Sequence, residues 1–203
     1  MRILSLDAST SNIGLAVLDH DLNDGYTKLI HLECYQPPEL DILYKLQAVR
    51  KFIQEKILYF KPDEVALEEI ILYMKGNSTA TTISSLAVLN RTVGLAVLDS
   101  LGAPPHLYNV LSVRHCIKDT EELPSKEQIP ELVARLLGIN FPYVYGKKGK
   151  FLSQNEDMAD AIAVGLAYIK FYHNPKKDPE LKKKNKNSKK KLKIKKKDGK
   201  SKK

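Results

Sequence analysis

The chain has little that would suit a secreted or membrane protein. It has no tryptophan and only two cysteines among 203 residues. Cys34 and Cys116 form no C-x-x-C pair, so we expect reduced thiols rather than a disulfide or a zinc cluster. No apolar run reaches the roughly 18 residues that span a bilayer, and "MRILSLDAST" enters a patterned strand without a signal-peptide cleavage site. We therefore expect a cytoplasmic protein, of a bacterium or a phage-infected host, with no membrane partner.

Positive charge is also scarce, except in the last 30 residues. Residues 174–203 hold 16 lysines against three acids, a net of +13, whereas the whole chain is at +9 and residues 1–173 are at −4. This tail has almost nothing to bury, so we expect it to be disordered. A lysine tail usually binds polyanions, most often nucleic acid, although it could serve only solubility or targeting. The sequence predicts one domain, residues 1–173, followed by a basic tail, residues 174–203.

Hydrophobic patterning predicts that the domain is of the α/β class. Three alternating segments joined by short polar turns indicate an antiparallel meander. Helical segments then alternate with two further apolar runs, which should be strands parallel to the first. The predicted strands are residues 2–9, 13–20, 26–35, 64–70 and 104–110, and the predicted helices are residues 39–60, 78–101, 112–119, 125–138 and 155–173. This order resembles the ribonuclease H-like fold, a five-stranded mixed sheet of order 3-2-1-4-5 flanked by helices.

Carboxylates interrupt three of the most apolar segments. Asp7 lies in mid-strand, where an unpaired buried carboxylate is costly, and Glu68 repeats the problem near the end of a strand expected beside it. Asp157 and Asp160 are spaced i, i+3 at the start of the last helix, where acids are also ordinary because they suit the helix dipole. If that helix crosses the sheet, the four acids converge and could not all ionise without a cation. Ligands of oxygen alone select Mg²⁺ or Mn²⁺, and two such ions can serve phosphodiester hydrolysis.

Three motifs carry a resemblance to a known family. They are "DASTSNIGLAVLD" in the first strand, "KPDEVALEE" in the fourth and "DMADAIA" in the last helix. In this order and spacing, residues 2–172 resemble the RuvC family of Holliday junction resolvases, and the second motif selects Glu68 over Glu69. The resemblance implies an endodeoxyribonuclease that resolves four-way DNA junctions by symmetric nicking, with two Mg²⁺ or Mn²⁺ ions per site. The implied ligands and catalytic acids are Asp7, Glu68, Asp157 and Asp160.

The resemblance also implies DNA-contacting positions. Where the family often has an aromatic residue three positions after its second acid, this chain has Ile71, with Tyr73 two residues later. Lys118 and Lys126 fall near DNA-contacting or catalytic lysines of the family, and Lys126 in "SKEQ" matches better, although a solvated helix-start lysine would look the same. We also expect DNA contacts from a basic loop before the last helix, at Lys147, Lys148 and Lys150.

The long helix predicted over residues 78–101 is apolar around nearly its whole circumference. A helix that lies on one sheet needs a single apolar stripe, so the excess indicates a second buried face. The similar family proteins are homodimers through this helix, and we accordingly expect Leu86, Leu89 and Val93 at a dimer interface. The alternative is that residues 142–145 of the same chain cover it.

Two other functions fit the same features. One is a related ribonuclease H-like nuclease that acts on flaps or on RNA–DNA hybrids. The other is a non-catalytic nucleic-acid-binding regulator on this fold, against which the retention of all four acids argues.

Overall fold

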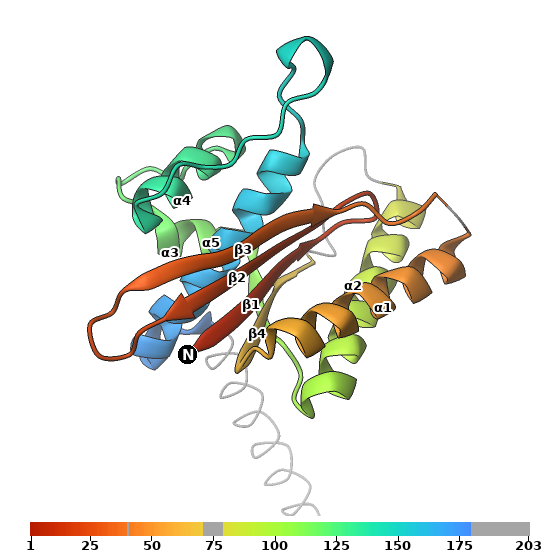
Figure 1. The fold of residues 1–203 in the computed structure, drawn as a ribbon, viewed down its shortest axis with the longest axis horizontal. Coiled ribbons are helices and arrows are strands. Elements are labelled where there is room, and N and C mark those ends of the chain that lie inside the picture. The colour runs from red at the N-terminus through yellow and green to blue at the C-terminus, as the bar shows by residue number, and fades with distance from the viewer. Residues whose placement is uncertain (40, 71–78, 180–203) are drawn as a thin grey trace, which may run out of the picture.

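The fold is built around a five-stranded sheet (Figure 1). The computed structural model describes residues 1–39, 41–70 and 79–179. The strands are β1 (Arg2–Ala8), β2 (Ile13–His20), β3 (Thr27–Tyr35), β4 (Glu64–Glu69) and β5 (His106–Asn109). Their order is β3-β2-β1-β4-β5; β1, β2 and β3 are antiparallel neighbours, and β4 is parallel to both β1 and β5. The strand order predicted from the sequence is confirmed.

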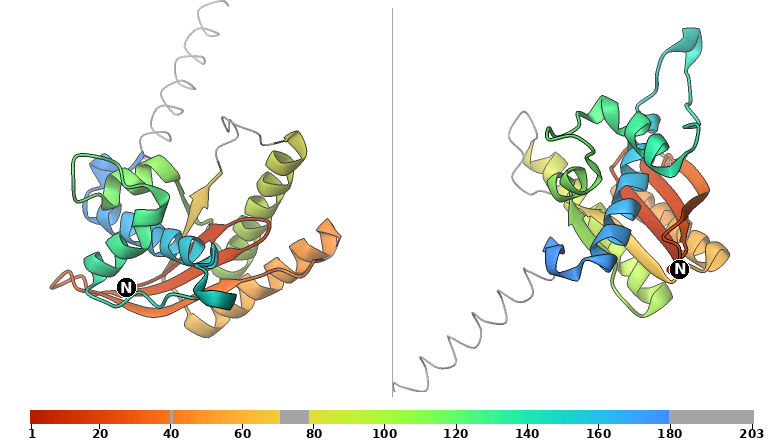
Figure 2. Two further views of the ribbon diagram at one scale, coloured as in Figure 1. Left: turned by 90° about the horizontal axis from the view of Figure 1, so that it is seen from above. Right: turned by 90° about the vertical axis from the view of Figure 1, so that its left-hand side faces the viewer.

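Helices cover both faces of the sheet (Figure 2). They are α1 (Ile42–Phe60), α2 (Ala80–Leu101), α3 (Val110–Ile117), α4 (Ile129–Leu137) and α5 (Gln154–His173), with short 3₁₀ turns η1 (Lys126–Gln128), η2 (Lys147–Gly149) and η3 (Pro175–Lys177). Helices α1 and α2 share one hydrophobic core with one face of the sheet. Helices α3, α4 and α5 share a second core with the other face. The acids of the last helix therefore approach the sheet from the side opposite α1 and α2.

Side-chain caps move two helix starts away from the predicted positions. The hydroxyl oxygen of Thr79 accepts a hydrogen bond from the backbone N–H of Thr82, so α2 begins at Ala80 rather than at residue 78. The side chain of Asn109 accepts from the N–H of Ser112, so α3 begins directly after β5. The strand predicted over residues 104–110 is shortened accordingly.

Close packing of α5 on the sheet depends on a small residue in mid-helix. A Cβ atom added to Gly165 would lie 2.6 Å from Cδ1 of Leu18 and 2.7 Å from Oγ of Ser5. Glycine thus lets the helix backbone approach β1 and β2 directly. This contact fixes the height of α5 above the strand that carries Asp7.

The structure corrects the expected dimer face of α2. Leu89 and Val93 are fully buried in the core that α2 shares with α1 and the sheet, so they are not available to a partner. The alternative cover, residues 142–145, is wrong as well, because that segment is bonded to α5 on the other face of the sheet. By length and composition α2 could cross a membrane; its packing against α1 and the sheet accounts for only part of its apolar character. The exposed apolar side chains of α2 are Val88, Leu95 and Leu98, while Leu86 is half-buried.

Candidate active site

Strand register places Asp7 and Glu68 on the same face of the sheet. Leu6 of β1 pairs with Leu67 of β4, so Asp7 and Glu68 occupy the next position of these parallel strands. Side chains alternate along a strand, and the even-numbered Leu6 and odd-numbered Leu67 both lie in the core beneath α1 and α2. Asp7 and Glu68 therefore face α5, whereas Glu69 lies on the same face of the sheet as Leu67. The register supports the choice of Glu68 over its neighbour.

The start of α5 brings two further acids to this face. Asp157 and Asp160 are both buried in the first two turns of the helix. The backbone of Asp157 lies against Gly14, the residue that pairs with Asp7 across β1 and β2. The first motif of the sequence thus links a strand carboxylate to Gly14, the residue on which α5 rests.

Burial raises the pKa values of all four acids, and the charges of other acids in the set add to this effect for Asp7, Glu68 and Asp160. Burial, followed by the charges of Glu68, Asp160 and Asp157, raises the pKa of Asp7 well above its usual range. Burial and the charge of Asp160 raise the pKa of Glu68 to about 7. Burial also raises the pKa of Asp160 to about 6. The carboxyl groups therefore lie close enough that ionising one disfavours ionising the next.

Asn12 is a site residue that the sequence did not reveal. Its Nδ2 donates a hydrogen bond of 2.8 Å to Oδ2 of Asp157, across 145 residues of sequence. Burial raises the pKa of Asp157, and this hydrogen bond partly offsets the increase. Gln36, directly after β3, donates to Oδ1 of Asn12 at 3.3 Å, which orients the amide. The turn between β1 and β2 therefore holds one of the acids in place.

Two basic side chains accompany the acids. Lys126 forms an ion pair of 3.1 Å with Oε2 of Glu156, and its charge lowers the pKa values of all four acids. Burial alone would lower the pKa of Lys126, but the hydrogen bond to Glu156 and the nearby acids raise it. Arg114 of α3 lowers the pKa values of Glu68 and Asp160, and its buried Nε has no hydrogen-bond partner in the described part of the chain. The sequence singled out Lys126 and missed Arg114, which stood in a short helix without a recognisable motif.

Asn90 holds the end of β4 from α2, on the face of the sheet opposite α5. Its buried side chain on α2 donates a hydrogen bond of 2.8 Å to the backbone carbonyl oxygen of Glu68. The strand end that carries Glu68 is thus held from the side of α2. Asn90 is one of several polar residues on α2, so no signal in the sequence pointed to this role.

The sequence of this chain matches a known protein family. The family model described as "Crossover junction endodeoxyribonuclease RuvC" matches residues 3–168. The chain belongs to the RuvC family. A curated RuvC from Syntrophomonas wolfei is 25% identical over 173 residues, covering 85% of this chain and 90% of that protein. It follows that this chain is a structure-selective endonuclease of the Holliday junction resolvase type.

Solved structures agree in fold with this RuvC-family chain. The Thermus thermophilus RuvC structure has a TM-score of 0.65 at 20% identity, covering 86% of this chain and 97% of that one. The yeast mitochondrial Holliday junction resolvase Ydc2 has a TM-score of 0.62 at 12% identity, covering 90% of this chain and 83% of that one. At these identities the likeness shows the shared architecture.

The acids of this RuvC-family chain suit a divalent cation. Among the described residues, no three His, Cys, Asp or Glu side chains already form a metal-holding cluster. The chemistry of the donors nevertheless fits Mg²⁺ or Mn²⁺, because all of them are carboxylate oxygens in one largely buried site. Burial, followed by the charge of Asp160, raises the pKa of Glu68 to about 7, and a bound divalent cation would oppose both effects.

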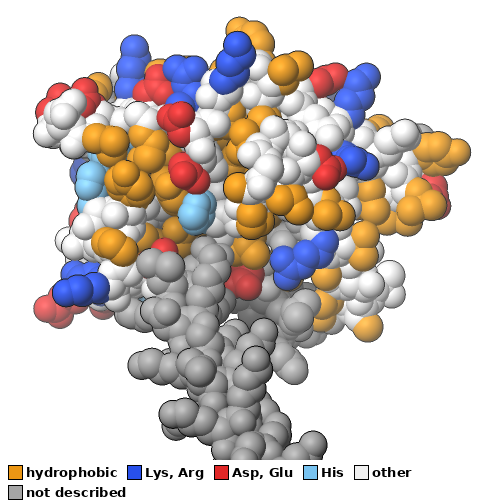
Figure 3. Space-filling model, turned by 90° about the horizontal axis from the view of Figure 1, so that it is seen from below, with side chains coloured by type: hydrophobic (Ala, Val, Ile, Leu, Met, Phe, Trp, Pro, Cys, Tyr) orange, Lys and Arg blue, Asp and Glu red, His pale blue; other side chains and the backbone are white. Residues whose placement is uncertain are grey.

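Three further groups of residues are expected to contact DNA. Lys118 ends α3 and donates its Nζ hydrogen bond to the backbone oxygen of Glu121 at 2.6 Å. Ile71 and Tyr73 lie outside the described residues. The basic loop residues Lys147, Lys148 and Lys150 are exposed just before α5. The face in Figure 3, where grey atoms do not cover it, mixes acidic, basic and apolar side chains rather than forming a uniformly basic surface.

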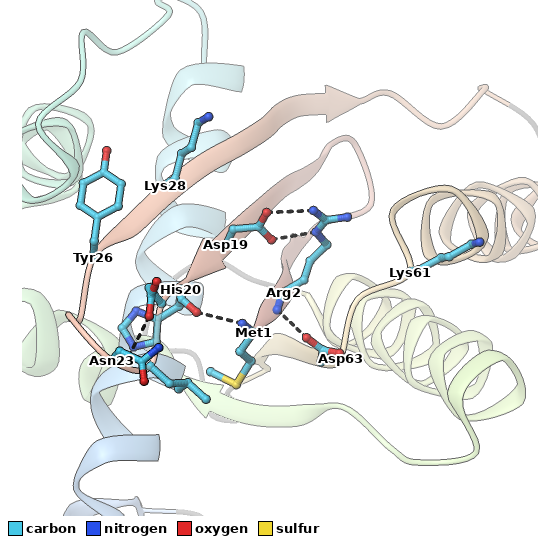
Figure 4. A pocket seen from close by; sticks show the side chains of 11 residues that line it. Met1, Arg2, Asp19, His20, Asn23, Tyr26, Lys28, Lys61 and Asp63 are labelled. Carbon is cyan, nitrogen blue, oxygen red and sulfur yellow. Dashed lines mark hydrogen bonds and ion pairs between the residues drawn. The ribbon is translucent and has the colours of Figure 1, made fainter.

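A pocket of about 710 Å³ lies at the other end of the sheet (Figure 4). Its wall includes Arg2, which is paired with Asp19 at 2.7 Å, and the amino group of Met1, which donates to the carbonyl oxygen of His20. Arg2 and Asp7 are five residues apart on one strand, a separation of roughly 16 Å. The pocket therefore lies away from the acids, and Arg2 and the amino group of Met1 are both paired within its wall.

Proposed function

We propose that this RuvC-family protein resolves four-way DNA junctions by symmetric nicking, with Asp7, Glu68, Asp157 and Asp160 as ligands of two Mg²⁺ or Mn²⁺ ions. The observation that carries the proposal is the meeting of these acids on one face with raised pKa values. Such a cluster is costly as a structural element, because burying carboxylates near one another opposes folding. A function that uses their charge accounts for its presence.

The chain's own residues prepare this site for phosphodiester hydrolysis. When bound, two divalent cations supply the positive charge that lets the acids ionise together and the Lewis acidity for the reaction. Asn12 holds the Asp157 carboxylate in one orientation. Glu156 positions the Lys126 ammonium group beside the acids, and Arg114 adds a second fixed positive charge. The side chains of Lys126 and Arg114 are suitably placed to attract the DNA phosphate toward the carboxylates.

Symmetric nicking requires two active sites, so we propose a homodimer. The exposed face of α2, formed by Val88, Leu95 and Leu98, supports the assignment of the interface to this helix. A two-fold pair would present two acid clusters to a substrate that itself has two-fold symmetry. We further propose that the partner is four-way or branched DNA, and that the protein acts in the cytoplasm without a membrane.

Cleavage of a synthetic four-way junction tests the proposal. We expect Mg²⁺-dependent, paired nicks from the wild type, and at least a 100-fold loss of rate in Asp7→Asn, Glu68→Gln and Asp160→Asn, with junction binding retained. Glu69→Gln is the matched control and should stay active, because the side chain of Glu69 lies on the opposite face of the sheet from Glu68. A dead Glu69→Gln beside an active Glu68→Gln would contradict the site.

The same assay separates the competing functions. Flap and RNA–DNA hybrid substrates, tested beside the junction, would identify a different nuclease if they were cut faster. Binding of junctions with no Mg²⁺- or Mn²⁺-dependent nicking would indicate a non-catalytic regulator.

A further inference from the structure

Residues 141–152, which we call the arm, project from the domain next to the catalytic helix. The arm is the teal excursion at the top of Figure 1 and is also seen in Figure 2. Tyr145 and Phe151 pair as an antiparallel bridge, and the N–H of Gly146 donates to the carbonyl oxygen of Lys150 at 2.7 Å. The turn η2 forms its tip. The arm is therefore a short hairpin with a defined shape.

Asn155 attaches both sides of this hairpin to α5. Its Oδ1 accepts a hydrogen bond of 2.7 Å from the N–H of Val144. Its Nδ2 donates to the carbonyl oxygens of Val144 at 2.8 Å and Leu152 at 2.9 Å. Asn155 is fully buried and lies two residues before Asp157. The position of the arm is thus tied to the helix that carries two of the acids.

The arm exposes aromatic rings and positive charge together. The side chains of Tyr145 and Phe151 are 59% and 42% exposed, and Tyr143 lies between them with ring centroids 6.2 Å and 5.8 Å away. The arm contains no acidic residue and has three exposed lysines, at Lys147, Lys148 and Lys150. Exposed aromatic side chains beside lysines are the chemistry that binds nucleic-acid bases by stacking and phosphates by charge.

We propose that the arm reads the branch point of the DNA, with Tyr145 and Phe151 stacking on bases that the junction leaves uncovered. This inference rests on the proposed function. A regular duplex offers its phosphates to lysines but keeps base faces stacked inside, so it gains little from exposed rings. At a branch point, base pairs beside the crossover can lose a stacking neighbour and present a face. The lysines of the arm supply affinity for any DNA, and the rings supply the preference for branched DNA.

The test compares four variants in binding without divalent cations. Tyr145→Ala with Phe151→Ala removes both rings, Tyr145→Phe with Phe151→Tyr keeps them, and substitution of the three arm lysines by alanine removes charge. The control, Tyr26→Ala, removes a tyrosine that is 62% exposed at the β2–β3 turn, at the other end of the sheet. Affinity is measured for a four-way junction and a duplex. A 2-aminopurine base at the branch point reports stacking through its fluorescence.

We expect the ring-removing variant to lose about tenfold in junction affinity, with duplex affinity unchanged and the fluorescence change on binding abolished. The ring-keeping variant and Tyr26→Ala should match the wild type in all three readouts. The lysine variant should lose affinity for junction and duplex by a similar factor while keeping the fluorescence change.

Other results would overturn the inference. If the ring-removing variant matches the wild type on both DNAs and in fluorescence, the arm does not read the branch point, and wild-type junction nicking would still support the proposed function. If that variant becomes monomeric by light scattering, the rings serve an interface between copies of the chain. A wild type that neither prefers nor nicks junctions would overturn the proposed function and this inference together.

Discussion

Gly14 lies so close beneath the first turn of α5 that a Cβ atom there would be 2.0 Å from the carbonyl oxygen of Asp157. Gly14 is also the residue that pairs with Asp7 between β1 and β2. The spacing from Asp7 to Gly14 therefore has a physical meaning: the β1–β2 hairpin returns a residue without a side chain to the place where α5 touches the sheet. Only this close approach brings Asp157 beside Asp7.

Gly14→Ala should accordingly damage the site without removing an acid. We expect it to lower the free energy of unfolding by about 2–3 kcal/mol, since the contact is with backbone that has little freedom to move. Junction nicking should fall strongly even at temperatures where the variant is folded. Gly94→Ala is the control, because nothing lies within 4 Å of the added Cβ on α2, and helix propensity should make that change neutral or stabilising by up to about 1 kcal/mol. Urea unfolding and the nicking rate check both variants.

The acid cluster predicts an unusual dependence of stability on pH. The pKa values of Glu68 and Asp160, about 7 and about 6, are higher than in an unfolded chain. The metal-free folded protein therefore binds more protons between about pH 4 and pH 7, so these groups destabilise it increasingly as pH rises through that window. The effect should be on the order of a few kcal/mol, and Mg²⁺ should oppose it by binding the ionised acids.

Comparison with Glu68→Gln isolates this contribution. Burial lowers the pKa of His20, which adds a slope of the opposite sign, but that slope is common to both proteins and cancels in the difference. Without metal, Glu68→Gln should be more stable than the wild type at about pH 8 and similar at about pH 4. Mg²⁺ should raise the melting temperature of the wild type more. Equal pH profiles and equal Mg²⁺ responses would contradict a shared site.

The dimer proposal makes a prediction for the exposed face of α2. Leu95→Arg changes a side chain that is 57% exposed, so we expect a folded monomer whose junction affinity falls on the order of 100-fold, because only one half of the two-fold site remains. Leu58→Arg, at 75% exposed on α1, is the control and should remain dimeric. Leu89→Arg should instead unfold the protein, since Leu89 is fully buried. A wild-type protein that is monomeric by light scattering would refute the proposal.

The sequence was informative where a residue contradicted its own surroundings. Asp7 in an apolar strand and Glu68 near the end of another were visible because burial of a carboxylate is costly wherever the strand lies. Asn12 and Arg114 were not visible, because their roles arise only from tertiary contacts with α5 and β4. The strand order came from the likeness of the element order to a known fold, since hydropathy alone does not specify which strands are neighbours.

The error over α2 has a related cause. A helix that is apolar all round has no single stripe to show which side meets its own core. Leu89 and Val93 face the sheet and α1, whereas Leu95 points outward, and only the packing distinguishes them. The number of apolar residues indicated a second apolar face, but not its position.

Deletion of the basic tail tests how affinity and selectivity are divided. The described chain continues past His173 through the turn η3 to a buried Asp178, so the deletion is best made over residues 180–203, which are outside the described residues. That segment carries 14 lysines against two acids. Lysine side chains bind phosphates through charge, which does not depend on sequence, so we expect weaker binding to all DNA and a flatter salt dependence, by roughly 0.9 in the logarithmic slope for each lost contact. The ratio of junction to duplex affinity and the rate at saturating junction should be preserved, because the acids and the arm remain.

Salt titrations of the full-length and shortened proteins on both DNAs measure this. Unchanged binding would leave the tail a role in solubility or targeting, and a selective loss of junction preference would place recognition in the tail instead.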